Sequence, residues 1–218
     1  MIMRYFISDI HLFHRLMLRE EHRGFSSFGE MHDVIVYRWN KVVKATDQVY
    51  IIGDFTFGKY EETKSIMDRL NGTKYLIKGN HDRKNERKFS TKQWLDLGFS
   101  EVMDEEIIKI NMDDDKIPLY LKHYPYQRHW LKDLFSRTPK EHKRTYHQLY
   151  PKYTNMWHIH GHIHGGDLIH DNEINVSWET LNGRPISEND IIELVKQQEK
   201  RPRILRFIER ILGRKFFR

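Results

Sequence analysis

The first eleven residues, Met1-Ile2-Met3-Arg4-Tyr5-Phe6-Ile7-Ser8-Asp9-Ile10-His11, set a pattern that the rest of the chain repeats. Residues 1–8 are an apolar and aromatic run, which predicts a buried first strand. Asp9 and His11 follow two positions apart, on the same side of an extended backbone, where a carboxylate and an imidazole can ligate one divalent ion. Such a triplet also occurs by chance. His14 and Arg15 behind it either support the ligands from outside or are ordinary surface residues, and the surface interpretation is favoured.

The same pattern, a strand followed by metal-competent side chains, recurs twice. Residues 48–52 lead into Gly53-Asp54, and residues 74–78 lead into Gly79-Asn80-His81-Asp82. Apolar residues at helical spacing predict helices over 28–44 and 61–70, between these strands. Strands that alternate with helices predict an α/β fold, in which loops at the carboxyl ends of the strands build one site.

The second half of the chain is richer in strands. Residues 105–111 and 117–122 flank Asp113-Asp114-Asp115, which predicts a hairpin with a solvated acidic turn rather than a cation site. The second of these strands ends in His123. A helix is expected over 92–97, and another begins after Ser187, a suitable N-cap residue.

Residues 158–165, His-Ile-His-Gly-His-Ile-His-Gly, place four histidines at alternate positions. We expect Gly161 to end the strand, so that His158 and His160 stay in it while His162 and His164 lie on the following loop. The alternatives are a polar strand face and a surface tract that binds metal adventitiously.

The composition indicates a folded protein with 13% aromatic and 39% hydrophobic residues among 218. We expect one domain over residues 1–199. Because the chain has no cysteine, disulfides, thiolate zinc sites and cysteine nucleophiles are excluded, which fits a cytoplasmic protein. A signal-peptide pattern and an apolar run long enough to span a membrane are both absent from the sequence.

The net charge of +6 belongs to the end of the chain. Residues 200–218 hold eight Lys and Arg against one Glu, which leaves 29 basic and 30 acidic residues in 1–199. Apolar residues at helical spacing predict a basic amphipathic helix over 200–218. Such a helix can pack on the domain, bind nucleic acid or lie on an anionic membrane.

The motifs, taken in order, resemble those of the calcineurin-like metallophosphoesterases. They are Asp9-x-His11, Gly53-Asp54, Gly79-Asn80-His81-Asp82, His123 and Gly161-His162-x-His164, and the resemblance runs from Ser8 to about Trp178. The chain is most similar to the small single-domain bacterial and phage-encoded members. The resemblance implies a four-layer α/β/β/α sandwich, in which two facing mixed β-sheets are flanked by helices.

The resemblance also implies a role for each motif residue. Asp9, His11 and His164 would hold one metal ion, Asn80, His123 and His162 the other, and Asp54 would bridge the two. His81 matches the general acid of the family, and Asp82 matches the residue that orients it. Two divalent ions are thus expected as cofactors; Mn, Fe, Ni and Zn all suit these ligands, and Mn is favoured.

The expected activity is hydrolysis of a phosphodiester, a nucleotide or short nucleic acid, by a metal-bound hydroxide. The alternatives are a small-molecule phosphomonoesterase and a metal-bearing scaffold without turnover. The basic, aromatic segment 126–153 is expected to overhang the site as a lid or wall, the alternative being a helical insertion with its own small core. The physiological substrate and the oligomeric state do not follow from the sequence.

Overall fold

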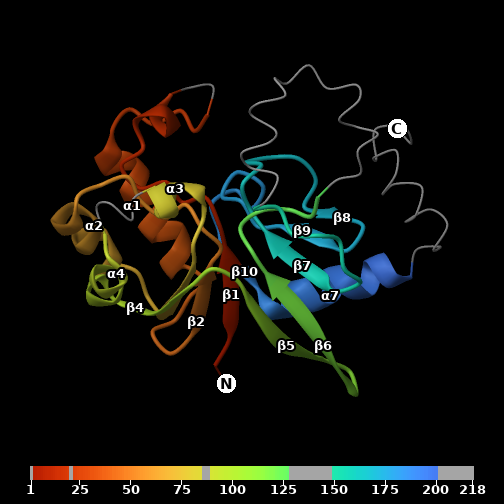
Figure 1. The fold of residues 1–218 in the computed structure, drawn as a ribbon. Helices are drawn as coiled ribbons and strands as arrows, with labels where there is room; N and C mark the ends of the chain where they lie inside the picture. Colours follow the sequence, from red (N-terminus) through yellow and green to blue (C-terminus); the bar gives the residue numbers. More distant parts are fainter. Residues whose placement is uncertain (1, 20–21, 85–88, 128–148, 201–218) are drawn as a thin grey trace.

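The computed structural model describes residues 2–19, 22–84, 89–127 and 149–200, whose strands form two five-stranded sheets (Figure 1). In the first sheet the strand order is β10-β1-β2-β3-β4. The strands β1 (Arg4–Ile7), β2 (Gln48–Ile51), β3 (Thr73–Ile77) and β4 (Phe99–Met103) are parallel, and the short β10 (Ile186–Ser187) pairs antiparallel with β1. The three strands predicted in this half of the chain are confirmed as β1, β2 and β3, whereas β4 is not among the predicted strands.

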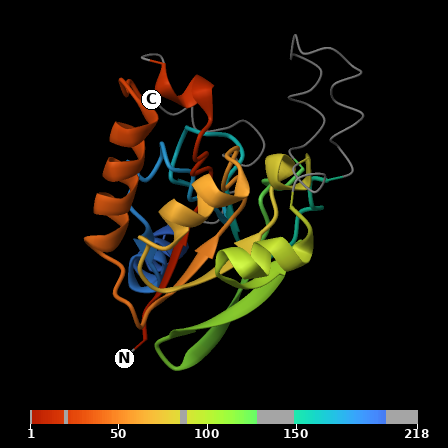
Figure 2. The same ribbon diagram turned by 90° about the vertical axis from the view of Figure 1, so that its left-hand side faces the viewer.

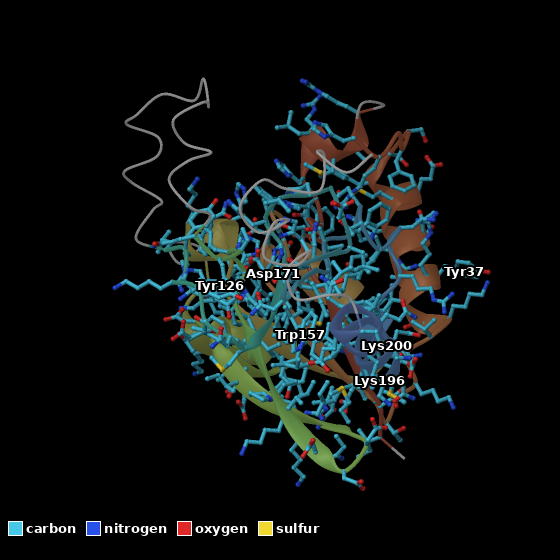
Figure 3. The ribbon with its side chains drawn as sticks, turned by 90° about the vertical axis from the view of Figure 1, so that its right-hand side faces the viewer. Tyr37, Tyr126, Trp157, Asp171, Lys196 and Lys200 are labelled. Atoms are coloured by element: carbon cyan, nitrogen blue, oxygen red, sulfur yellow. The ribbon has the colours of Figure 1, made fainter. Side chains whose placement is uncertain are left out.

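Helices cover the outer face of this sheet (Figure 2). They are α1 (Phe28–Asn40), α2 (Tyr60–Met67) and α4 (Thr91–Leu97), with the short η1 (Arg15–Leu18) and α3 (Asn80–Lys84) at the ends of loops. The α1 face made of Met31, Ile35 and Trp39 is at most 2% exposed, whereas Tyr37 on the opposite side points into solvent (Figure 3). The helix predicted over 28–44 therefore has the predicted buried face, but it ends at Asn40.

The second sheet has the strand order β5-β6-β7-β9-β8. The strands β5 (Glu106–Met112) and β6 (Asp115–Leu121) form the predicted hairpin, whose turn at Asp113 and Asp114 is exposed. The strands β7 (Trp157–His160) and β9 (Glu173–Asn175) continue parallel to β6, and β8 (Ile169–His170) pairs antiparallel with β9. Both sheets are therefore mixed, as expected.

An apolar core joins the two sheets. Phe6, Ile52 and Ile77 of the first sheet and its loops share one buried cluster with Leu119, Ile159 and Ile174 of the second. The helix α7 (Glu188–Glu199) adds Ile191 and Val195 to the same cluster and begins, as predicted, at Ser187, whose hydroxyl accepts the Asp190 N–H. This core fixes the two sheets face to face, so their strand ends share one edge.

The protein is thus a two-sheet α/β sandwich with helices on the first sheet and α7 beside the inner core. The four-layer arrangement stays a prediction. Most of the predicted insertion at 126–153 and nearly all of the predicted helix at 200–218 lie outside the described residues. Among the described helices, none is both long and apolar enough to cross a membrane.

Candidate metal centre

The predicted ligands come from loops that follow strands of both sheets (Figure 1, upper end). Asp9 and His11 follow β1, Asp54 follows β2, and Asn80 follows β3. In the second sheet, His123 follows β6, and His162 and His164 follow β7. Backbone hydrogen bonds join the loops, since the N–H groups of Asp9 and His11 donate to Gly53 O and Asp54 O, each at 3.0 Å. The structure therefore brings all seven predicted ligands to one edge, where β7 ends before Gly161 as predicted.

Five of the seven residues adopt left-handed backbone conformations. The φ angles are 56° at Asp9, 52° at His11, 57° at Asp54, 74° at His162 and 53° at His164. Such conformations cost about 1–3 kcal/mol each and persist where the surrounding structure determines them. The positive φ angles therefore raise the backbone energy at these strand ends, and the contacts between the loops must compensate for it.

Glycines let these loops approach closely. A Cβ atom at Gly161 would overlap the Ser8 hydroxyl and the Asp9 carboxylate, and one at Gly79 would overlap the Asp54 carboxylate. Each glycine directly precedes a predicted ligand, so the glycines of the motifs are required for the contact between neighbouring loops.

The first set of donor atoms comprises Asp9, His11 and His164. The Nε2 atoms of His11 and His164 are 3.1 Å apart, and they lie 3.7 and 3.5 Å from Asp9 Oδ1. Donors bound at about 2.0–2.2 Å to one ion are about 3 Å from each other, so this spacing is typical of ligands around a common centre. Among the described residues, these three form one of two groups of acidic and histidine side chains that could hold an ion.

The second set comprises Asn80, His123 and His162. Asn80 Oδ1 lies 3.0 Å from His123 Nε2 and 2.9 Å from His162 Nδ1. His162 therefore faces the cluster with Nδ1, unlike the other three histidines. His123 Nδ1 lies 2.8 Å from Ile52 O, and donation of its proton there leaves the Nε2 lone pair free for a ligand bond.

Asp54 stands between the two sets. Its Oδ2 atom is 3.8 Å from His11 Nε2 and 3.5 Å from His123 Nε2, while its Oδ1 accepts the His81 N–H at 2.8 Å. Together with Asp9 and His123 it forms the second candidate group, whose donor atoms lie within 4.8 Å of one another. The Asp54 carboxylate thus lies within 4 Å of a histidine nitrogen of each donor set.

A buried oxygen without a partner indicates that a cation fits here. Asp9 is fully buried, and its Oδ1 has no hydrogen-bond donor within the described chain, although Oδ2 accepts the His162 N–H at 2.9 Å. Burial opposes ionisation, but the neighbouring histidines hold the pKa of Asp9 below its ordinary value. An ionised, buried and unsatisfied oxygen is costly unless a cation compensates it, so the donor set fits a divalent ion.

The pKa values of the histidines reflect the same charges. Burial lowers the pKa of His123, but the carboxylates of Asp54 and Asp9 outweigh this effect and raise it to about 9. Burial and the nearby His123 lower the pKa of His162 to about 4. The carboxylates therefore attract positive charge, and His162 is neutral at pH 7, as a metal ligand must be.

His81 lies beside the donor sets rather than within them. Its ring packs on Phe57 at 4.7 Å between centroids, its Nε2 is 3.9 Å from Asp54 Oδ2, and its side chain is 29% exposed. Burial lowers its pKa while Asp54 opposes this effect. The imidazole is accessible to solvent and uncommitted to the ligand sets, as a proton donor requires.

Asp82 contacts the backbone of two neighbouring loops. Its carboxylate accepts the backbone N–H groups of Asp54 at 2.6 Å, Phe55 at 3.0 Å and Gly79 at 2.9 Å. A carboxylate with these partners holds the loops after β2 and β3 together. Because one of these loops also carries His81, the predicted role of Asp82 in orienting His81 stays a prediction.

Three residues near the centre were missed or misjudged from the sequence. For His14 the structure favours the alternative to a surface residue, because its Nδ1 is 3.2 Å from His11 Nδ1 and its ring stacks on Phe57 at 3.8 Å. Arg15 is exposed, as the surface interpretation expects. Glu179 Oε2 lies 3.1 Å from His164 Nδ1, and Arg23 pairs with Glu179. No motif links residues so far apart in the chain.

Aromatic rings border the second donor set. The ring of His162 lies 4.9 Å from that of Tyr124 and 5.7 Å from that of Tyr150, and the two tyrosines contact each other at 5.2 Å. His158 and His160 instead lie in β7, almost fully buried, with His158 against the ring of Tyr126 at 4.3 Å. The histidine run is thus divided at Gly161 as predicted.

The fold and the site together define a two-sheet α/β protein with a His, Asp and Asn cluster that could hold metal ions. No protein-family model matches the chain. An uncharacterized protein of Methanocaldococcus jannaschii is 27% identical over 202 residues, covering 88% of this chain and 91% of its own. The Gene 66 protein of Mycobacterium phage L5 is 28% identical over 208 residues, covering 88% and 93%.

A solved structure has a similar fold over most of the chain. It is a protein of unknown function from Aquifex aeolicus, 27% identical, with a TM-score of 0.58 over 89% of this chain and all of the other. The similarity in fold therefore extends over most of the chain, and the chemistry must be argued from the site itself.

Proposed function

We propose that the protein is a dinuclear metal-dependent phosphoesterase of the calcineurin-like type that hydrolyses a phosphodiester, either a nucleotide or a short nucleic acid. The observation that carries the proposal is the arrangement of two donor sets around one shared carboxylate, Asp54 Oδ2, which lies within 4 Å of a histidine nitrogen of each set.

Asp9, His11 and His164 would hold one ion and Asn80, His123 and His162 the other, with Asp54 between them. Two neighbouring divalent ions lower the pKa of water and offset the charge that develops on a phosphoryl group. The proposed ligand set contains two carboxylates, Asp9 and Asp54, so the ligand charge of −2 would leave the loaded centre positive and attractive to phosphate.

The chain itself would handle the leaving group. The half-exposed imidazole of His81 lies at the border of the cluster, where it can donate a proton to the departing oxygen. The backbone N–H of His81 donates to Asp54 Oδ1, and the neighbouring Asp82 carboxylate anchors the loops that carry both residues. The acid and the shared ligand are therefore held by one local network.

The choice of a diester is supported by the aromatic border of the site. The ring of Tyr150, which is partly exposed beside His162, offers apolar surface on which a nucleobase can stack, and the buried Tyr124 packs against it. A small phosphomonoester without an aromatic group would make no use of this surface.

A substrate and metal screen tests the proposal. Metal-free protein is reconstituted separately with Mn²⁺, Fe²⁺, Ni²⁺ and Zn²⁺ and assayed on bis(p-nitrophenyl) phosphate, p-nitrophenyl phosphate, cyclic nucleotides and single-stranded oligonucleotides. We expect metal-dependent diester hydrolysis, strongest with Mn²⁺, that Asp54→Asn abolishes.

The matched control is Glu188→Ala, which removes an Arg4–Glu188 ion pair at the opposite end of β1 and should leave turnover intact. Activity confined to monoesters would overturn the choice of substrate. Two bound ions without hydrolysis of any ester would support the scaffold alternative instead.

A further inference from the structure

We infer that Glu179 and Arg23 form a positioning pair for the ion held by Asp9, His11 and His164, and that this pair acts on that ion and not on the other. The inference rests on the proposed two-metal centre, but it does not depend on which ester is hydrolysed.

Glu179 connects His164 to a buried guanidinium. Its Oε2 lies 3.1 Å from His164 Nδ1, and its Oε1 accepts from Arg23 Nε at 2.9 Å and lies 2.8 Å from Nη2. The Arg23 side chain is fully buried, and its guanidinium lies 4.2 Å above the ring of Trp178. A guanidinium buried against an aromatic ring needs well-placed hydrogen-bond and charge partners. The Arg23–Glu179 ion pair is therefore part of the folded interior rather than a surface contact.

Arg23 also holds the loop that carries Asp9. Its Nη2 donates to Asp9 O at 2.6 Å and its Nη1 donates to Ile10 O at 2.7 Å. One guanidinium thus fixes the loop after β1 and, through Glu179, the ring of His164 from the loop after β7. Asp9 and His164, which both belong to the first donor set, follow strands of different sheets.

The contact to His164 determines which nitrogen is free. A carboxylate that accepts the Nδ1 proton leaves the lone pair on Nε2 and raises the basicity of the ring. Nε2 is the atom that faces His11 Nε2 at 3.1 Å and Asp9 Oδ1 at 3.5 Å. Glu179 therefore orients His164 in the state and direction that ion binding requires.

The second donor set is held differently. His123 Nδ1 faces the backbone oxygen of Ile52, and His162 is flanked by the rings of Tyr124 and Tyr150. Loss of Glu179 should therefore weaken one of the two ions, whereas a general structural defect would weaken both.

The test is a Mn²⁺ titration of the metal-free protein by calorimetry, with electron paramagnetic resonance of the loaded samples. We expect two ions in the wild type and a spin-coupled pair. Glu179→Ala should bind one ion about 10- to 100-fold more weakly and give the spectrum of isolated Mn²⁺ at substoichiometric loading. The ion that Glu179→Ala weakens should be the one that His164→Ala weakens, and not the one that Asn80→Ala weakens.

Two further variants separate positioning from folding. Glu179→Gln keeps one acceptor oxygen and should lose less affinity than Glu179→Ala, and it provides the measurement if the alanine variant does not fold. Glu188→Ala breaks a comparable Arg–Glu pair away from the site and should bind both ions normally.

Wild-type affinity for both ions in both Glu179 variants would overturn the inference, and so would an equal loss at both sites. A wild type that binds fewer than two ions would instead overturn the proposed two-metal centre. Melting temperatures, measured for every variant without metal, identify losses that come from unfolding.

Discussion

At the scale of single residues, His81 and His164 lie in the same cluster but have different surroundings. His164 Nε2 points at Asp9 and His11, whereas the His81 ring packs on Phe57 and remains partly exposed. We predict that His81→Ala keeps both ions and lowers kcat about 10²- to 10⁴-fold on a nucleotide diester, which has a poor leaving group. Metal analysis and steady-state kinetics measure the two effects.

The leaving group provides an internal control for this prediction. p-Nitrophenolate departs without a proton, so His81→Ala should impair bis(p-nitrophenyl) phosphate hydrolysis less than hydrolysis of the nucleotide. His164→Ala should impair both substrates and lose an ion. Loss of metal in His81→Ala would contradict the assignment of His81 as the acid.

Asp82 gives a prediction about stability. Its carboxylate is fully buried and accepts three backbone N–H groups, so Asp82→Ala would leave three buried donors unsatisfied. We predict a loss of about 3–5 kcal/mol in the free energy of unfolding, with a smaller loss for Asp82→Asn, which retains one acceptor oxygen. Urea denaturation measures it; an unchanged stability with lost turnover would favour direct orientation of His81.

The sequence was informative where local pattern and chemistry coincide. Asp54 and Asn80 each follow a glycine at the end of a predicted strand, and that pattern was enough to place them at one edge. Glu179 and Arg23 were not found, because their contact joins distant parts of the chain and neither residue belongs to a motif. His14 was misjudged because its burial depends on Phe57, which comes from another loop.

At the scale of elements, the ends of helices and the short strands were the least predictable features. Val43 continues the apolar spacing of α1 and is buried, but it lies in the turn after the helix. β4 alternates poorly, with Ser100 and Glu101 both exposed, so its strand character comes from pairing with β3 rather than from its own pattern. Tertiary contacts, not local preference, decide both cases.

The helix α1 also carries a buried histidine whose titration should be measurable. His32 is 3% exposed, its Nε2 accepts the Phe13 N–H at 3.2 Å, and burial lowers its pKa to about 4. Since the pKa in the folded state is depressed, the neutral ring stabilises the fold above pH 6.5, and this contribution is lost as the pH falls towards 4.

We predict that the metal-free wild type loses about 2 kcal/mol of stability between pH 6.5 and 4.5 relative to His32→Gln. The glutamine can accept the Phe13 N–H but does not titrate, so the comparison removes the contribution of other acidic groups. Urea unfolding at the two pH values measures the difference. Parallel pH dependence in the two proteins would show that His32 titrates normally.

At the scale of the whole molecule, the candidate centre spans both sheets. The first sheet delivers Asp9, His11, Asp54 and Asn80, and the second delivers His123, His162 and His164. The unfolded chain has no such cluster, so ions that bind the folded state should stabilise the docking of the sheets. A ligand at 100 times its Kd adds about 2.7 kcal/mol per site.

We therefore predict that Mn²⁺ raises the Tm of the metal-free protein by about 5–10 °C per occupied site, and that a chelator reverses the shift. Asp54→Asn should reduce the shift most among single ligand substitutions, because Asp54 Oδ2 lies within 4 Å of a histidine nitrogen of each donor set. Glu188→Ala should lower the starting Tm yet keep the full shift. If none of Mn²⁺, Fe²⁺, Ni²⁺ and Zn²⁺ moves the Tm, the strained strand ends serve another purpose than holding metal, since an ion bound across both sheets must stabilise them.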